Sequence, residues 1–320
     1  MGTKTAAAVD LGTNSVKLTI GRKADSGQVE ILDDATRITR LGKGVDASGE
    51  LASESVSRTL EALQEFRQRM DHHGVETVGA VGTSALRDAR NGATFVTQAQ
   101  QVLGGTVEII SGEREAALVY QAAWGDGQIR EKMTALGAEF LVTTDSGGGS
   151  TEFVIGGATG IAYAESLNIG AVRLTEQTGF SDPPTPEEIE RARAHADTVL
   201  EAVPRPDGPA LVAASGGTVA NLAAMEWMAR NPGESLTGET IHTRLHGLSL
   251  TEGQIEARIA LLAALSLEQR RRVPGLEPDR ADVILAGAII QARSLRRLGA
   301  NELVVSTRGL RYGLLYELLG

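Results

Sequence analysis

The sequence contains no cysteine, so disulfide bonds and thiolate metal sites are excluded. Phe, Trp and Tyr make up only 3% of the residues, and the cores must therefore be built from Ala, Val, Leu and Ile. No apolar run approaches the roughly 18 residues that a membrane-spanning helix requires. The apolar run near the N-terminus is interrupted by Asp10, which is typical of a strand and not of a signal peptide. We therefore expect a soluble, cytoplasmic protein without a membrane partner.

Positive charge is also in short supply, because 31 Lys and Arg residues against 41 Asp and Glu residues give a net charge of −10. This balance argues against nucleic acid as a partner, since nucleic acids are bound mainly by cationic surfaces. It does not argue against a small anionic substrate. A local cluster of positive charge or of backbone N–H groups can hold phosphate on an acidic protein.

At 320 residues the chain is long for a single core, and strand and helix patterns alternate along it. The alternation predicts an α/β protein with mixed sheets flanked by helices. Apolar spacing predicts a helix over 53–70, with Ser53 or Ser55 as its N-cap. Another helix is predicted to begin at Pro186, with Thr185 as its cap.

An internal repeat is visible when DLGTNSVKLTIG (10–21) is aligned with DSGGGSTEFVIG (145–156). Asp, Gly, Ser, Ile and Gly recur at the same positions without a gap. Each copy follows an apolar strand and leads into another strand. Two strand–turn–strand units, each opening one half of the chain, predict two similar domains that face each other across a cleft.

The turns in this repeat have the residue types of a phosphate site. Glycine turns leave backbone N–H groups uncovered and let a ligand approach the main chain. Asp10 and Asp145 end the leading strands, where they could hold Mg²⁺, which commonly uses one or two carboxylates plus substrate phosphates. The alternative is a pair of structural hairpins with Asp as a turn former. A third glycine element, AASGGTVANL (213–222), is either an anion-binding helix start or a plain strand–helix connection.

Seven segments occur in the order and approximate spacing of one family, and together they extend from residue 6 to about residue 316: AAAVDLGTNSVKL, GTSALRDARN, IISGEREAALVY, DSGGGSTEFVIG, SLNIGAVRLTE, ASGGTVANL and DRADVILAGAIIQ. In these segments the chain resembles the exopolyphosphatase/guanosine pentaphosphate phosphatase family of the actin, sugar kinase and Hsp70 ATPase superfamily. The resemblance implies two actin-like (ribonuclease H-like) domains with mixed sheets, over 1–124 and 125–304. It also implies a C-terminal helix within 305–320 that returns to the first domain, as in the short, two-domain form of the family.

The resemblance also implies roles for individual residues. Glu115 in SGEREA takes the place of the catalytic base, although Glu113 lies nearby, and Arg87 and Glu152 complete the catalytic set. On the residues alone, Glu115 is better explained as a solvated carboxylate in a first helical turn, and it is the family resemblance that favours the catalytic role. The implied metal ligands are Asp145, Asp10 and Glu115. The implied phosphate-binding residues are Asn14, Ser15, Gly147, Gly148, Gly149, Ser150, Gly216 and Gly217.

These assignments predict an exopolyphosphatase that releases the terminal orthophosphate of inorganic polyphosphate with Mg²⁺, or with Mn²⁺, and without an organic cofactor. We expect it to be a homodimer. The alternatives are hydrolysis of the 5′ phosphate of pppGpp, a non-catalytic sensor that binds ppGpp or polyphosphate, and a kinase or ATPase. The absence of a recognisable guanine-binding segment favours polyphosphate, and the retained carboxylates argue against pure binding.

Several features lie outside this scheme. The segment between Glu115 and Asp145 is longer than is usual in the family, and Tyr312 takes a position where many members carry Glu. His242 and His246 have i,i+4 spacing without the Glu of a zinc protease, and we interpret them as solvated or capping histidines. His72 and His73 precede a glycine and mark a helix end. A cluster of Arg37, Arg40 and Lys43 is either a solvated strand and turn or a polyanion contact.

Overall fold

The structure, a computed structural model, describes residues 4–24, 28–236 and 238–320. They form two compact units, one made of the residues up to Ala122 together with Leu310–Gly320, and one made of Ala123–Gly309. Within the described ranges, no helix is both long and apolar enough to cross a membrane.

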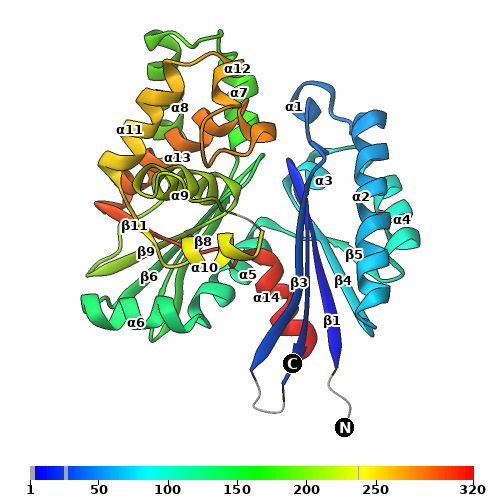
Figure 1. Cartoon of the computed structure of the whole chain (residues 1–320). Helices are drawn as coiled ribbons and strands as arrows, with labels where there is room; N and C mark the ends of the chain where they lie inside the picture. The colour runs from blue at the N-terminus through cyan, green and yellow to red at the C-terminus, as the bar shows by residue number, and fades with distance from the viewer. Residues whose placement is uncertain (1–3, 25–27, 237) are drawn as a thin grey trace. The chain divides into compact units, whose positions relative to one another are not determined.

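Unit 1 contains a five-stranded mixed sheet in the order β3-β2-β1-β4-β5, with helices on both faces (Figure 1). Strand β2 is antiparallel to both of its neighbours, whereas β1, β4 and β5 are parallel. The strands are β1 (Thr5–Leu11), β2 (Ser15–Lys23), β3 (Val29–Ile38), β4 (Thr77–Gly82) and β5 (Thr106–Ile109). The helices are α1 (Val45–Ser48), α2 (Ser53–His72), α3 (Ser84–Asp88), α4 (Gly92–Leu103), α5 (Gly112–Trp124, which ends in unit 2) and α14 (Leu310–Leu319).

Strand β1 is buried along its whole length because its alternate side chains enter two different cores. Val9 belongs to the core beneath α2 and α4, with Phe66 and Phe95. Ala8 belongs to the core beneath α5 and α14, with Leu118. Asp10 follows Ala8 by two residues and therefore points to the same face of the sheet as α5 and α14.

Unit 2 contains a six-stranded mixed sheet in the order β10-β11-β9-β6-β7-β8. Its strands are β6 (Phe140–Ser146), β7 (Thr151–Gly157), β8 (Gly160–Leu167), β9 (Ala210–Ser215), β10 (Ser249–Thr251) and β11 (Glu302–Val305). Its helices are α6 (Gly127–Leu136), α7 (Ala171–Thr178), α8 (Pro186–Leu200), α9 (Gly217–Arg230), α10 (Gly238–Leu245), α11 (Glu252–Ala263), α12 (Leu267–Arg270), α13 (Ile284–Leu298) and a 3₁₀ turn at Pro278–Arg280.

The two sheets have the same topology, as the sequence repeat predicts. In unit 2 the order β8-β7-β6-β9-β11 repeats the order β3-β2-β1-β4-β5 of unit 1, and the parallel and antiparallel pairings also correspond. Strand β10 is an addition at the edge beyond β11. The predicted fold class, two mixed sheets flanked by helices, is confirmed.

Predictions about helix ends are partly confirmed. Thr185 caps α8 in a complete capping box with Glu188, and His73 is the C-cap of α2. The prediction of a serine cap for α2 is wrong, because the N-cap is Ala52 and no side chain bonds to the helix start. The cost is small for a helix of 20 residues, since its stability comes from the apolar face that it buries.

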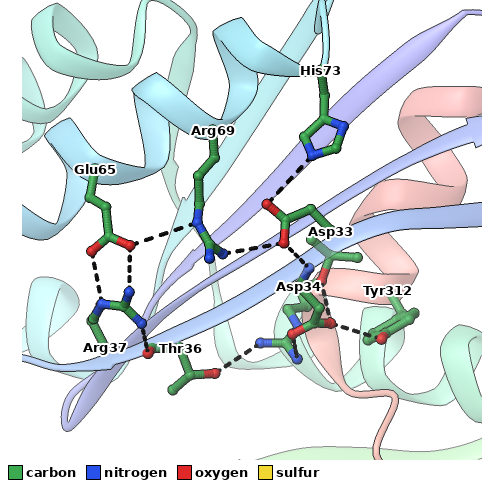
Figure 2. Close-up of polar contacts among 10 residues, drawn as sticks. Asp33, Asp34, Thr36, Arg37, Glu65, Arg69, His73 and Tyr312 are labelled. Carbon is green, nitrogen blue, oxygen red and sulfur yellow. Dashed lines mark hydrogen bonds and ion pairs between the residues drawn. The ribbon is translucent and has the colours of Figure 1, made fainter. Parts of the chain in front are cut away.

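A polar network joins β3, α2 and α14 within unit 1 and accounts for two residues that the sequence left open (Figure 2). Arg37 forms two hydrogen bonds with Glu65, so its charge is already matched inside the unit. Tyr312 donates its hydroxyl hydrogen bond to Asp34 at 2.8 Å, and Arg311 donates to the same carboxylate at 2.6 Å. A glutamate at position 312 would face the Asp34 carboxylate, so tyrosine suits this neighbour.

Candidate active site

The first turn of the repeat, between β1 and β2, is closed by a hydrogen bond from Gly12 N–H to Ser15 O of 3.2 Å. A neighbouring segment holds the turn from outside, since Thr39 and Arg40 donate their N–H groups to Asn14 O at 3.1 and 2.9 Å. Arg40 has a φ of 54°, a left-handed conformation that is uncommon outside glycine. The turn is therefore fixed by main-chain contacts, which leave its side chains and outer N–H groups for other partners.

The second turn, between β6 and β7, closes at the equivalent positions with Gly147 N–H to Ser150 O at 2.9 Å. Gly147 is exposed, whereas Gly148 and Gly149 are buried. The Gly148 carbonyl accepts from the N–H groups of Val172 and Arg173 at the start of α7. The first N–H groups of α7 are thus bonded to the turn and hold its carbonyl oxygens away from any bound anion.

Four main-chain donors remain in these turns. Among the described residues, no acceptor bonds to the N–H groups of Thr13, Asn14, Gly148 or Gly149. The side-chain Nδ2 of Asn14 is buried and likewise has no acceptor within the described ranges. Buried donors nearly always have a partner, so donors left over in a glycine turn favour an anionic ligand.

The two aspartates of the repeat have different cross-strand neighbours: one faces a lysine and the other faces a glutamate. In unit 1, Asp10 is paired in register with Lys17, whose Nζ lies 3.1 Å from Asp10 Oδ2. In unit 2, Asp145 is paired in register with Glu152, and the two residues are only 9% and 2% exposed. Ser166 donates to Glu152 at 2.7 Å. Like charges opposite each other are unfavourable in a sheet, so the second turn differs from the first in its local charge.

Glu115 lies in the first turn of α5 and is buried, whereas Glu113 in the same turn is exposed. Arg87 Nη1 donates to Glu115 Oε2 at 2.9 Å and to Ile110 O at 3.0 Å. A hydrogen bond from Ser111 lowers the pKa of Glu113, so this exposed carboxylate is held in its ionised form. Burial and the arginine contact single out Glu115 as the carboxylate whose position is fixed.

Strand topology brings the unit 1 residues to one edge. Asp10 ends β1, Arg87 follows β4 and Glu115 follows β5, and these three strands are parallel. Carboxyl ends of parallel strands lie at the same edge of a sheet, where ligands of open α/β sheets bind. In unit 2, Asp145 near the end of β6 and Gly216 and Gly217 after β9 lie at the corresponding edge of the second sheet.

The third glycine element begins α9 in unit 2. Gly216 has a φ of 98°, and a Cβ there would lie 2.7 Å from Asp145 Oδ1, so only glycine fits. Gly217 is close to the guanidinium of Arg280, which is 8% exposed and bonded to Glu277 at 2.6 Å. A buried arginine beside a helix N-terminus strengthens an anion site.

The residues that could hold a magnesium ion differ between the units. Asp10 and Glu115 each have a cation of the protein at hydrogen-bond distance. Asp145 lies beside a second carboxylate, and its oxygens are approached by Gly216 and Gly309, where added Cβ atoms would come within 2.7 and 3.0 Å. Within the described ranges, no three His, Cys, Asp or Glu side chains converge as ligands. Mg²⁺ commonly uses one or two carboxylates with phosphate and water, so the Asp145–Glu152 pair fits it best.

Sequence reasoning missed Lys17 and Arg280. Lys17 and Glu152 occupy the same position in the aligned repeat, and this reversal of charge could have indicated that the two turns differ. Arg280 lies in the DRADVIL segment, where spacing alone does not show that it reaches Gly217. His246 was interpreted as solvated or capping; it is not solvated, because its side chain is only 7% exposed. The side chain of His242 lies outside the described part of the structure.

Open N–H groups, buried arginines and fixed carboxylates define a protein that acts on phosphate groups. The model of the Ppx/GppA phosphatase family matches residues 19–320. Exopolyphosphatase 2 of Mycobacterium tuberculosis is 36% identical over 327 aligned residues, covering 98% of each chain. The crystal structure of the Ppx/GppA family member of Aquifex aeolicus superposes with a TM-score of 0.78 and 33% identity, over 99% of this chain and 98% of that one.

A guanosine-5′-triphosphate,3′-diphosphate pyrophosphatase of Photobacterium profundum is 30% identical, covering 98% of this chain and 59% of that protein. The chain belongs to the Ppx/GppA phosphatase family and is a hydrolase of phosphate groups. The family resemblance stated from the seven sequence segments is thereby confirmed.

Proposed function

We propose that the protein is an exopolyphosphatase, which hydrolyses the terminal phosphoanhydride bond of inorganic polyphosphate. The observation that carries the proposal is the set of unbonded N–H groups in both glycine turns, together with the hydrogen-bonded Arg87–Glu115 pair. The turns suit a chain of phosphates, and the carboxylate suits a water nucleophile. The name of the M. tuberculosis relative supports the same substrate.

Phosphoryl transfer is mostly positioning and neutralisation of charge. In the proposed reaction, the main-chain N–H groups of Thr13 and Asn14 in unit 1 donate to phosphate oxygens, and those of Gly148 and Gly149 in unit 2 are donors of the same kind. A water oxygen attacks the terminal phosphorus in line, the bridging P–O bond breaks, and the shortened polyphosphate leaves with the electron pair. Arg87 holds Oε2 of Glu115 in place, and the Glu115 carboxylate accepts the proton of the water.

Asp145 and Glu152 would hold Mg²⁺ in this scheme. When bound, the ion would neutralise the charge of phosphate oxygens. Asp10 has a different role, since Lys17 already balances its carboxylate and leaves an ammonium group at the first turn. Lys17 is 25% exposed and can turn toward phosphate.

The experiment that tests the proposal is phosphate release from long polyphosphate, short polyphosphate, pppGpp and ATP, each with and without Mg²⁺. We expect the highest kcat/KM with polyphosphate and Mg²⁺. Activity on ATP alone, or none on any polyphosphate, would contradict it.

Hydrolysis of pppGpp is the second candidate, and a cavity in unit 2 favours it. The cavity has a volume of about 250 Å³ and lies beside the first turns of α9, next to Gly216 and Gly217. It is lined by Ala220, Asn221, Ala224, Leu236, Leu245, Gly275, Leu276 and Glu277. Asn221 is already bonded to Gly217 O and to Glu277 N–H, so the polar lining has little left to select one base. We therefore rank pppGpp below polyphosphate, and the substrate series above decides between them.

A further inference from the structure

The long segment between Glu115 and Asp145 forms α6, and the residue before this helix is almost completely buried. Asp126 is 1% exposed and is the N-cap of α6. Its Oδ1 accepts from the N–H groups of Gln128 and Ile129 at 2.9 and 3.1 Å. One carboxylate oxygen is thus used by the helix, and the other points elsewhere.

The second oxygen, Oδ2, lies 3.2 Å from Nε2 of His246 and 2.8 Å from Nη1 of Arg308. Burial alone would raise the pKa of Asp126, but His246, the N–H of Ile129 and Arg308 outweigh it and the pKa is lowered. The carboxylate is therefore ionised. It links the start of α6 with the residue after α10 and with the chain that follows β11.

His246 has a defined orientation in this cluster. Its Nδ1 accepts a hydrogen bond from Thr307 N–H at 3.3 Å, and its Nε2 lies 3.2 Å from Asp126 Oδ2. The next residue strengthens the contact, since Gly247 N–H donates to Val305 O at 2.8 Å. His246 thus holds the backbone at Thr307, and Asp126 holds the side chain of Arg308.

The segment held in this way reaches the proposed metal site. Ser306 continues the sheet through a 2.7 Å bond to Ala214 O, and its hydroxyl donates to Arg308 O at 2.9 Å. Gly309 follows directly, and a Cβ there would lie 3.0 Å from Asp145 Oδ2 and 3.5 Å from Ser215 Oγ. The backbone at Gly309 is therefore one wall of the space around the Asp145 carboxylate.

We propose that His246, anchored by Asp126, is a positioning residue that holds Ser306–Gly309 against the Asp145 carboxylate. This role rests on the proposed function in one respect, that Asp145 binds the metal. The proposal also assigns a role to the long segment between Glu115 and Asp145. Asp126 in this segment supplies the fixed charge beside the imidazole of His246. His246 itself touches neither substrate nor metal in this scheme.

The test compares three substitutions of the histidine by the concentration of Mg²⁺ that gives half-maximal activity, and by the Mg²⁺-dependent rise in melting temperature. His246→Ala removes both contacts, and we expect the half-maximal Mg²⁺ concentration to rise about fivefold or more. His246→Asn retains an acceptor near the position of Nδ1 and should restore most of the wild-type value. His246→Gln places its amide nearer the position of Nε2 and should not.

The matched control is His73→Ala, which removes a histidine 3.7 Å from Asp33 in unit 1 and should leave the Mg²⁺ response unchanged. If His246→Ala lowers the melting temperature but leaves both Mg²⁺ readouts at wild-type values, the cluster is structural only and the proposal is wrong. Equal behaviour of the Asn and Gln variants would also overturn it.

The proposed function can fail separately from this inference. A wild-type protein without activity on polyphosphate removes the exopolyphosphatase assignment, while the melting-temperature response to Mg²⁺ still tests the role of His246. If Asp145→Asn retains that response, Asp145 does not bind the ion and the positioning role falls with it.

Discussion

At the scale of single residues, the repeat shows how two copies of one turn have acquired different chemistry. Lys17 and Glu152 occupy equivalent positions, and each is the cross-strand neighbour of the aspartate in its unit. The lysine balances Asp10 internally, whereas Glu152 adds negative charge beside Asp145. One change of charge thus distinguishes the two turns, and it is the reason why we propose the second turn, and not the first, for Mg²⁺.

The first prediction follows from this difference. Asp145→Asn should raise the half-maximal Mg²⁺ concentration, because it removes a charged oxygen ligand. Asp10→Asn should change the Mg²⁺ requirement much less, since its partner is Lys17. Titration of Mg²⁺ against phosphate release measures both. If the two variants shift the midpoint equally, the distinction between the turns is wrong.

Glu115→Gln should keep the fold and substrate binding but lower kcat by on the order of 10²–10⁴, the usual contribution of a general base. Glu113→Gln is the matched control, because that carboxylate lies in the same helical turn and is exposed. Steady-state kinetics with polyphosphate measures both variants. A Glu115→Gln enzyme that retains more than about half of the wild-type turnover would remove this residue from the mechanism.

Gly148→Val tests whether the glycine turn serves the substrate. The three glycines of this turn are not among the described residues with positive φ, so a side chain at Gly148 meets no left-handed backbone strain. Gly148 is buried and its N–H is unbonded, so a side chain should obstruct the anion. We expect KM for polyphosphate to rise about tenfold, or roughly 1.4 kcal/mol. A normal KM with a lowered melting temperature would show that the glycine serves the turn alone.

At the scale of elements, the N-termini of α8 and α2 differ in capping, and this difference can be tested by its effect on stability. Thr185→Ala should destabilise unit 2 by about 1 kcal/mol, because its hydroxyl accepts the N–H of Glu188 in the capping box of α8. Ser53→Ala should cost far less, since no side chain caps α2. Chemical denaturation of the two variants compares them directly. An equal loss of stability would contradict the difference in capping.

The order of elements and the repeat could be predicted from sequence because they depend on local patterns. Apolar periodicity defined α2 and α8, and the aligned turns anticipated the shared topology of both sheets. The environment of His246 could not be predicted, because its partners Asp126 and Thr307 lie far away in the sequence. Contacts between distant segments depend on packing, and spacing within one segment does not report them.

At the scale of the whole molecule, partly buried ion pairs make the folded state sensitive to acid. Hydrogen bonds from Arg193 on α8, partly opposed by burial, lower the pKa of Glu256 on α11 below its ordinary value of 4.5. The folded pKa is the lower one, so the stabilisation is complete above about pH 4.5 and is lost as the pH falls through the folded pKa. We expect the melting temperature to fall below about pH 4.5, and Glu256→Gln to lessen that fall. An identical pH profile in the variant would exclude this pair as a contributor.

The division of the chain has a consequence for how the protein is made. Unit 2 is one uninterrupted stretch, whereas unit 1 also needs Leu310–Gly320, whose helix α14 (red in Figure 1) packs on β1. On the ribosome, the face of β1 that carries Ala6 and Ala8 can be covered early by α5, but its second cover, α14, arrives only after all of unit 2 has emerged. Domains generally fold in the order of their synthesis. Here the first sheet to be translated is the last to be completed, and the nascent chain must keep that apolar face from aggregating in the meantime.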